Sequence, residues 1–315
     1  MGLLGTLGNW LAPRAAPDAA LGVALARAVD TVDPLLRAVS GWERRLAPAV
    51  AAALEHCERL AAAIPGPVAI DRRGFSADSL VHALFATPDD IGEMLGRSRE
   101  LREFLADPGN ADCAGFHALL GVRRREKAVS GMAREGEVIR RDVPQRLLYF
   151  ADHTLDEVAA DQDATRERLR QAAFDSVARG FAACVADLRQ VQLDARTALQ
   201  IERARNGRGE RRLELEARQR EAIASLAPER LLDAYADWLA SAEQRVYLKH
   251  DEVRVDRMGV IADASAPDGE LATLRLPELV GRDRRQWSVL VVRIGREDAL
   301  EAVSRRDEAN RYILI

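Results

Sequence analysis

Apolar residues recur at three- and four-residue steps along residues 169–199, with charged residues on either flank. An α-helix repeats every 3.6 residues, so this spacing places the apolar side chains in one narrow stripe on a helix face. A narrow stripe of this length is typical of a coiled coil or of a long antiparallel helical hairpin. We therefore expect one long helix over roughly residues 155–205. The stripe comprises Leu169, Ala173, Val177, Phe181, Cys184, Leu188, Val191, Ala195 and Leu199.

A second helix is expected to fold back on the long one. Asn-Gly-Arg-Gly at 206–209 interrupts the pattern, and apolar residues resume at helical spacing from Leu213 to Leu226. Two helices joined by so short a connection pack antiparallel, and Ala227-Pro228 then starts a third helix. The return helix is the shorter one, so we expect a protein partner or self-association to cover the rest of the stripe. The residues of that contact are Leu169, Val177, Phe181, Leu188 and Leu199.

The composition also favours helices before this region. Alanine and leucine dominate an apolar content of 48%, and only 5% of the residues are aromatic, a balance typical of packed helices. Residues 18–64 predict two helices, the second starting at Asp33-Pro34. Thr87 and Ser98 are N-cap candidates for two shorter helices. A further helix is expected to carry Phe116, Leu119 and Leu120.

Residues 135–163 predict a change of structure ahead of the long helix. Within "GEVIRRDVPQRLLYFADHTL" two strands can pair around a turn at Pro144-Gln145, where proline suits the second turn position. Thr154 and Glu157 then form a capping box that starts the long helix. Asp152 and His153 are thus expected at a strand-to-helix junction.

The last 70 residues have a strand-like pattern. The segments "EVRVDRMGVI", "ELATLRL" and "WSVLVVRI" are rich in β-branched residues, alternate in part, and are separated by Gly and Pro turns. The sequence therefore predicts a mainly α, α+β protein: a helical bundle with a long antiparallel helical hairpin and a small C-terminal antiparallel β subdomain. The expected domains are 1–134, 135–245 and 246–315.

Two residues at the junction are candidates for catalysis. His153 beside Asp152, with Arg140 and Arg141 on the preceding strand, has the residue types of an acid–base site. Consecutive strand residues point to opposite faces, so adjacency in sequence does not make His153 and Asp152 a catalytic pair. A histidine at a helix start also has an ordinary structural role.

Arginine clusters are candidates for anion binding. Residues 121–146 hold eight basic and four acidic residues, a net charge of +4, and residues 151–163 hold five acids and no base. Guanidinium groups bind phosphate and carboxylate in a bidentate manner. Alternatively, the basic and acidic segments pair with each other across the fold. The candidates are Arg123, Arg124, Arg125, Arg140, Arg141, Arg282, Arg284 and Arg285.

Several known chemistries have no signature in this sequence. Neither lysine follows a glycine, as a Walker A loop requires, and there is no Gly-x-Ser-x-Gly, Cys-x-x-Cys or His-Glu-x-x-His motif. Cys113 and His117, four residues apart on an expected helix, are the weak candidates for metal ligands. We expect no cofactor.

The composition also predicts the compartment. Three widely separated cysteines suit a reducing environment. No apolar run reaches the length of a membrane span, and the first residues lack the basic region of a secretory signal. Arginine makes up 44 of the 46 basic residues and alanine is abundant, which indicates a GC-rich, bacterial genome. We expect a cytoplasmic protein.

These patterns favour a non-catalytic interaction, adaptor or regulatory protein with a helical hairpin and arginine-rich surfaces. An alternative is an enzyme or a protein that binds a small anionic ligand near Arg140, Arg141, Asp152 and His153. A further alternative is nucleic-acid or phosphate binding by the arginine clusters. The formal net charge of −4 does not favour nucleic acid as a partner.

Overall fold

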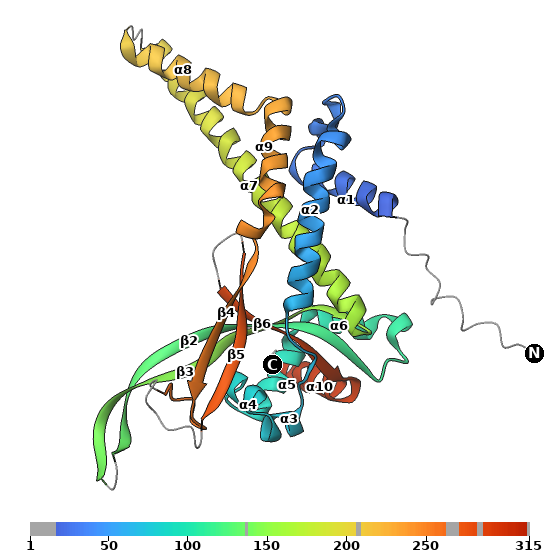
Figure 1. The fold of residues 1–315 in the computed structure, drawn as a ribbon, viewed down its shortest axis with the longest axis vertical. Coiled ribbons are helices and arrows are strands. Elements are labelled where there is room, and N and C mark those ends of the chain that lie inside the picture. Colours follow the sequence, from blue (N-terminus) through green and yellow to red (C-terminus); the bar gives the residue numbers. More distant parts are fainter. Residues whose placement is uncertain (1–16, 136–137, 206–208, 263–270, 282–285, 314–315) are drawn as a thin grey trace, which may run out of the picture. The chain divides into compact units, whose positions relative to one another are not determined.

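The computed structural model describes residues 17–135, 138–205, 209–262, 271–281 and 286–313 (Figure 1). Contacts divide the chain into two compact units, and each unit combines two separate stretches of sequence. Unit 1 is Met1–His56 with Phe174–Gln244, and unit 2 is Cys57–Ala173 with Arg245–Ile315. The sequence predicted three consecutive domains, and the structure differs because residues 135–245 are shared between the two units.

Unit 1 is helical in its described residues. Its core includes an aromatic cluster: the ring of Phe181 stacks on Tyr235 at 4.8 Å between centroids, and Trp238 donates from Nε1 to the carbonyl oxygen of Val177 at 2.9 Å. The Tyr235 hydroxyl donates to the carbonyl oxygen of Ala28 at 3.2 Å. The elements are α1 (Pro17–Val32), η1 (Pro34–Ala38), α2 (Trp42–Ala63), α7 (Gln162–Ala204), α8 (Glu210–Ser225), α9 (Pro228–Ala240) and η3 (Ala242–Gln244), with α2 and α7 also contributing residues to unit 2.

Unit 2 is built on one sheet with the strand order β3-β2-β6-β5-β4. Neighbouring strands along this order are antiparallel, and β1 pairs with β6 in parallel. The strands β2 and β3 extend past the other strands as a long curved ribbon (Figure 1). The strands are β1 (Val68–Ala69), β2 (Gly115–Glu135), β3 (Val138–Ala159), β4 (Tyr247–Val255), β5 (Ala272–Val280) and β6 (Gln286–Gly295).

Short helices cover one face of this sheet, which we call the inner face. Alternate residues of β2, from Phe116 to Val122, pack there against Leu290 of β6 and Leu101 of α6. The capping box of Thr87 and Asp90 starts α5, and the Ser98 side chain accepts from Leu101 N at the start of α6, as predicted. The elements are α3 (Arg72–Ala77), α4 (Ser79–Leu84), α5 (Pro88–Arg97), α6 (Arg99–Ala106), η2 (Pro108–Asn110) and α10 (Arg296–Ile313).

The opposite face of the sheet is apolar as well. Ile64 at the end of α2 and Leu169 in the first turns of α7 pack there against Val289, Val291 and Trp287 of β6. The strands β2 and β6 are therefore buried on both faces, which removes the simple alternation of apolar and polar residues.

Three local predictions are wrong. Residues 115–135 form strand β2 and not a helix. Phe116 and Leu120 pack on one face of this strand and Leu119 packs on the other, so its apolar residues do not alternate with polar ones. Residues 138–159 form one continuous strand, so Pro144-Gln145 is not a turn. The long helix starts at Gln162, where Asp161 accepts from Ala164 N at 2.7 Å, and not at Thr154.

The C-terminal strands do not form a separate subdomain. Strand β6 pairs with β2 from Gly115↔Gly295 to Val122↔Ser288, which joins β4, β5 and β6 to the ribbon in one sheet. The α+β class follows from this architecture, while the pairing partner of the C-terminal strands differs from the predicted one. A long-range pairing of this kind leaves no local trace in the sequence.

Candidate ligand-binding site

The sheet of unit 2 closes on itself at one end. After β4 the chain turns at Asp256–Gly259, where the Asp256 carboxylate accepts from Val260 N at 2.9 Å and Gly259 has φ +78°. Leu148 N of β3 then donates to the Gly259 carbonyl oxygen at 2.8 Å, and Val255 bridges Ile261. Hydrogen-bonded segments thus form a ring that encloses this end of the inner face.

Register places a set of polar residues side by side within this ring. Glu278 of β5 pairs with Lys249 of β4 on one side and with Ser288 of β6 on the other. Paired residues project to the same face with Cβ atoms about 4.5–5.5 Å apart. Leu276 and Leu290 of the apolar core lie two residues from Glu278 and Ser288, so these polar groups extend the inner face. We call Arg124, Lys249, Asp251, Glu278 and Ser288 the polar end of that face.

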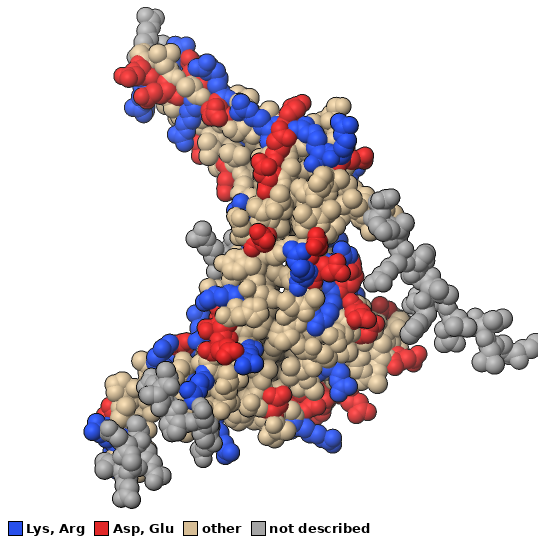
Figure 2. Space-filling model, viewed as in Figure 1, with Lys and Arg blue, Asp and Glu red and all other residues tan. Residues whose placement is uncertain are grey.

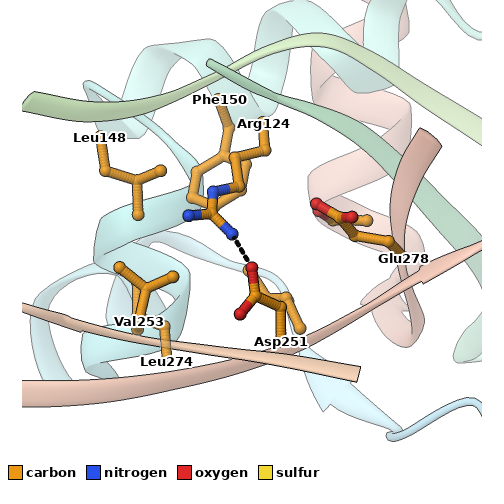
Figure 3. A pocket seen from close by; sticks show the side chains of 9 residues that line it. Arg124, Leu148, Phe150, Asp251, Val253, Leu274 and Glu278 are labelled. Atoms are coloured by element: carbon orange, nitrogen blue, oxygen red, sulfur yellow. Dashed lines mark hydrogen bonds and ion pairs between the residues drawn. The ribbon is translucent and has the colours of Figure 1, made fainter. Parts of the chain in front are cut away.

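Arg124 of β2 holds the ring together across its interior. Its Nη1 donates to Asp251 Oδ2 at 2.5 Å, and its Nη2 donates to Glu126 Oε1 at 2.7 Å. Figure 3 shows the guanidinium pointing toward Asp251, with Phe150 beside the Arg124 side chain and Glu278 on the other side of the pocket. The remaining wall is apolar and consists of Leu148, Val253, Leu274 and Leu276.

The charges of this cluster depend on one another. Burial acts to lower the pKa of Arg124, but its hydrogen bonds to Asp251 and Glu126 outweigh burial and raise the pKa. The hydrogen bond from Arg146, followed by that from Arg124, holds the pKa of Glu126 below its ordinary value against the opposing effect of burial. Arg124 is therefore a fixed cation between two carboxylates.

Two buried polar atoms of the polar end lack a hydrogen bond. Glu278 Oε2 and Ser288 Oγ are buried and have no hydrogen-bond partner among the described residues. The Glu278 side chain is 8% exposed, and its nearest cation, Lys249 Nζ, lies 3.8 Å from Oε2, beyond hydrogen-bonding distance. A buried acceptor left without a partner costs about 1–3 kcal/mol. An additional hydrogen-bond donor beside these two atoms would therefore stabilise them.

Space for such a donor adjoins the cluster. A cavity of about 360 Å³ opens beside Glu278, and five of its six lining residues are charged. A further space of about 10 Å³ lies inside, next to Ser288 and Arg124, which is about the volume that one water molecule needs. The lining residues of the larger cavity are Arg124, Glu126, Lys249, Asp251, Glu278 and Gln286.

The structure separates Asp152 from His153. Asp152, at φ +54°, accepts from Arg123 Nη1 at 3.2 Å and forms an ion pair with Arg125 at 3.9 Å. The His153 ring instead stacks on Phe85 at 4.7 Å, with Nε2 2.7 Å from the carbonyl oxygen of Leu84. The two side chains therefore contact different residues and do not form a pair.

The candidate arginines also separate into groups. Arg124 enters the polar end, whereas Arg123 lies over the Trp287 ring at 5.8 Å on the opposite face. Arg140, which pairs with Ala133, and its neighbour Arg141 lie far along the ribbon, roughly 36–40 Å along the strand from Asp152 at about 3.3 Å per residue. Arg282, Arg284 and Arg285 lie outside the described residues.

Basic and acidic side chains are interspersed on the surface. On the face drawn in Figure 2, blue and red side chains alternate over α8 and over the strands. Arg125 pairs with Asp152, and Arg146 pairs with Glu126, so basic residues of 121–146 meet acids both within their own segment and beyond it. This arrangement corresponds to the structural alternative for the charged segments.

The weak metal candidates occupy different kinds of structure. Cys113 precedes β2 in a loop, and His117 lies within β2, so the helical spacing expected for them does not apply. Burial, followed by the nearby Arg293, lowers the pKa of His117. Among the described residues no three histidine, cysteine, aspartate or glutamate side chains are grouped so as to hold a metal ion.

Sequence reasoning missed Asp251, Glu278 and Ser288. The signal available was local: in "LRLPELV" a single glutamate interrupts an apolar strand, which indicates either a solvated edge or a buried carboxylate. Its neighbours in space, Arg124 and Lys249, lie far away in the sequence and could not be paired with it.

Among the residues that the structure describes, no helix is both long and apolar enough to cross a membrane. No protein-family model, curated protein or solved structure matches this chain. The functional assignment therefore depends on the geometry of the polar end.

Proposed function

We propose that this protein is a non-catalytic regulatory protein that binds a small polar ligand in the cavity of the polar end. The observation that supports the proposal is the buried, unpartnered atom Glu278 Oε2, whose residue lines a cavity of about 360 Å³, together with the unpartnered Ser288 Oγ next to the smaller space of about 10 Å³. Most buried polar groups in proteins have a partner. A ligand that donates to Glu278 supplies the missing one.

The walls of the cavity suit a binding role. Arg124 is tied to Asp251 and Glu126, so the charges that face a ligand are fixed before it arrives. Prepositioned polar groups lower the ordering cost of association. The apolar wall of Leu148, Val253 and Leu274 limits access of water to the Arg124–Asp251 pair from one side.

Native mass spectrometry combined with thermal unfolding tests this function. A panel of small polar solutes is added to the wild-type chain and to Glu278→Gln, with Glu252→Gln as the matched control. Glu252 is an exposed carboxylate of the neighbouring strand β4, paired with Arg275 of β5 at 2.7 Å. We expect at least one solute to add mass and to raise Tm in the wild type and in Glu252→Gln, but not in Glu278→Gln. Equal responses of all three chains would refute the cavity as the binding site.

A second role is supported by exposed apolar side chains on α7 and α8. We propose that these helices form the antiparallel hairpin expected from the sequence, with ion pairs from Arg203 to Glu216 and from Arg211 to Glu202. Leu169, Val177, Phe181 and Leu199 are buried within the chain and Leu188 is half-buried, so the predicted stripe offers little free surface. The exposed apolar side chains of the two helices are Val191 of the stripe and, outside it, Leu193, Ile201, Leu213 and Ile223.

Self-association through this free surface is the second candidate function. Leu213 is 65% exposed, and its replacement by arginine leaves the buried stripe intact. We expect sedimentation to give a dimer for the wild type and a monomer for Leu213→Arg. A monomeric wild type would refute self-association.

We also propose a cytoplasmic location, consistent with the three free cysteines Cys57, Cys113 and Cys184.

A further inference from the structure

Lys249 lies beside the carboxylate oxygen of Glu278 that has no hydrogen bond among the described residues. Its side chain is 53% exposed, and Nζ stops 3.8 Å from Glu278 Oε2, whereas the Glu278 side chain is 8% exposed. The ammonium group thus neutralises Glu278 without forming a hydrogen bond. A lysine side chain has a flexible four-carbon stem and can leave such a position at little cost.

We propose that the ligand carries an ammonium group and displaces Lys249 from Glu278, so that the lysine acts as a tethered competitor. This inference rests on the proposed binding function and specifies its ligand class. An ionised carboxylate accepts hydrogen bonds and cannot donate them, so Glu278 Oε2 selects a donor. A small alkylammonium ion offers three donors and the positive charge that Lys249 now supplies.

The charges around the cavity favour a cation. Two cations, Arg124 and Lys249, face three carboxylates, Glu126, Asp251 and Glu278, and Arg146 pairs with Glu126 from outside the lining, so the cluster is neutral while Lys249 is in place. Departure of Lys249 changes that net charge to −1, and an incoming ammonium ion restores neutrality. Ser288, across the strand pair from Glu278, lines the smaller space of about 10 Å³ and is not among the lining residues of the larger cavity.

If Lys249 competes with the ligand for Glu278, the affinity for an alkylammonium ion depends on Lys249. Because a tethered competitor lowers the apparent affinity, Lys249→Met binds an alkylammonium ion about tenfold more tightly or better. Glu278→Gln loses the charge that both cations require and binds at least about tenfold more weakly. A quaternary ammonium ion has the same charge and no N–H donor, so it does not replace Lys249.

The chain offers an internal control for this exchange. Lys127 and Lys249 are its only lysines, so labelling lysine with ¹³C at Cε gives two side-chain NMR signals. Lys127 is exposed on the ribbon strand β2, outside the cavity lining, and reports general salt effects. Lys127→Arg and Lys249→Arg assign the two signals.

The probes are methylammonium chloride, tetramethylammonium chloride and potassium chloride at equal ionic strength. We expect methylammonium to shift the Lys249 signal in a saturable way while the Lys127 signal stays in place. In Glu278→Gln the effect disappears, and a circular dichroism spectrum and Tm equal to those of the wild type show that this variant is folded. Titration of ¹³C-methylammonium into Lys249→Met measures the gain in affinity.

Two outcomes overturn the inference, and they separate it from the proposed function. If a solute of the panel binds through Glu278 but no ammonium probe moves the Lys249 signal, the binding function stands and the displacement is wrong. If tetramethylammonium or potassium moves Lys249 equally, the effect is screening of charge and the displacement is again wrong. If no solute binds at all, the proposed function and this inference fail together.

Discussion

The inner face of the sheet has an apolar end and a polar end, which are built from the same strands. The two ends differ in whether their buried groups are satisfied by their surroundings. At the apolar end, Leu120, Leu276 and Leu290 are buried beneath α4–α6 and α10. At the polar end, two residues away on β5 and β6, Glu278 and Ser288 are also buried but keep atoms without a hydrogen bond among the described residues. Apolar contacts are non-directional and are satisfied by packing alone, whereas a polar atom needs a partner in the right place. The first end therefore stabilises the fold, and the second is the end at which we propose that a ligand binds.

The largest expected effect is at the apolar end. Leu120→Ala removes a side chain that is 0% exposed, and the cavity left behind costs about 2–5 kcal/mol of unfolding free energy. Urea denaturation measures the loss. Leu300→Ala on α10, where the side chain is 47% exposed, is the control and should cost less than about 1 kcal/mol. Equal losses would contradict the assignment of the main core to this end.

An intermediate effect is expected at Arg124. Arg124→Met leaves Asp251 and Glu126 without their shared cation, but both carboxylates retain contact with water, so the cost is about 1–2 kcal/mol. Arg275→Met is the matched control, because Arg275 forms an exposed pair with Glu252 worth less than about 1 kcal/mol. The same denaturation series compares the two. A loss at Arg124 no larger than at Arg275 would show that the pair does not hold the ring.

The smallest effect should have the opposite sign. Ser288→Ala removes a buried hydroxyl that has no partner among the described residues, so we expect the ligand-free protein to be unchanged or more stable by up to about 1 kcal/mol. Ser130→Ala, at an exposed serine that bonds to Asp142, serves as the control. A clear loss of stability in Ser288→Ala alone would mean that a bound water already satisfies the hydroxyl.

The sequence predicted local features of the fold better than distant ones. The helix starts at Thr87, Ser98 and Pro228 were predicted because capping residues and proline act on their own backbone. Strand β2 was mistaken for a helix because Phe116, Ala118 and Leu120 face one side while Leu119 faces the other. When both faces are buried, periodicity no longer separates a strand from a helix.

The polar end was beyond sequence reasoning for a related reason. Arg124 was among the anion-binding candidates, but its partner Asp251 is 127 residues away. Charge sums over neighbouring residues give no information about such a pair. Glu278 and Ser288 became candidates only when strand register placed them next to each other and burial showed that they lack partners.

The order of the strands has a consequence for synthesis on the ribosome. Residues 115–122 of β2 pair with residues 288–295 of β6, so one edge of the ribbon stays open until the C-terminal strands emerge. About 170 further residues must be translated in between, which takes roughly ten to thirty seconds at about 5–20 residues per second. The Phe116–Val122 segment is apolar on the face that later joins the core. During that interval the nascent chain depends on chaperones or on its own helices to keep this edge from aggregating.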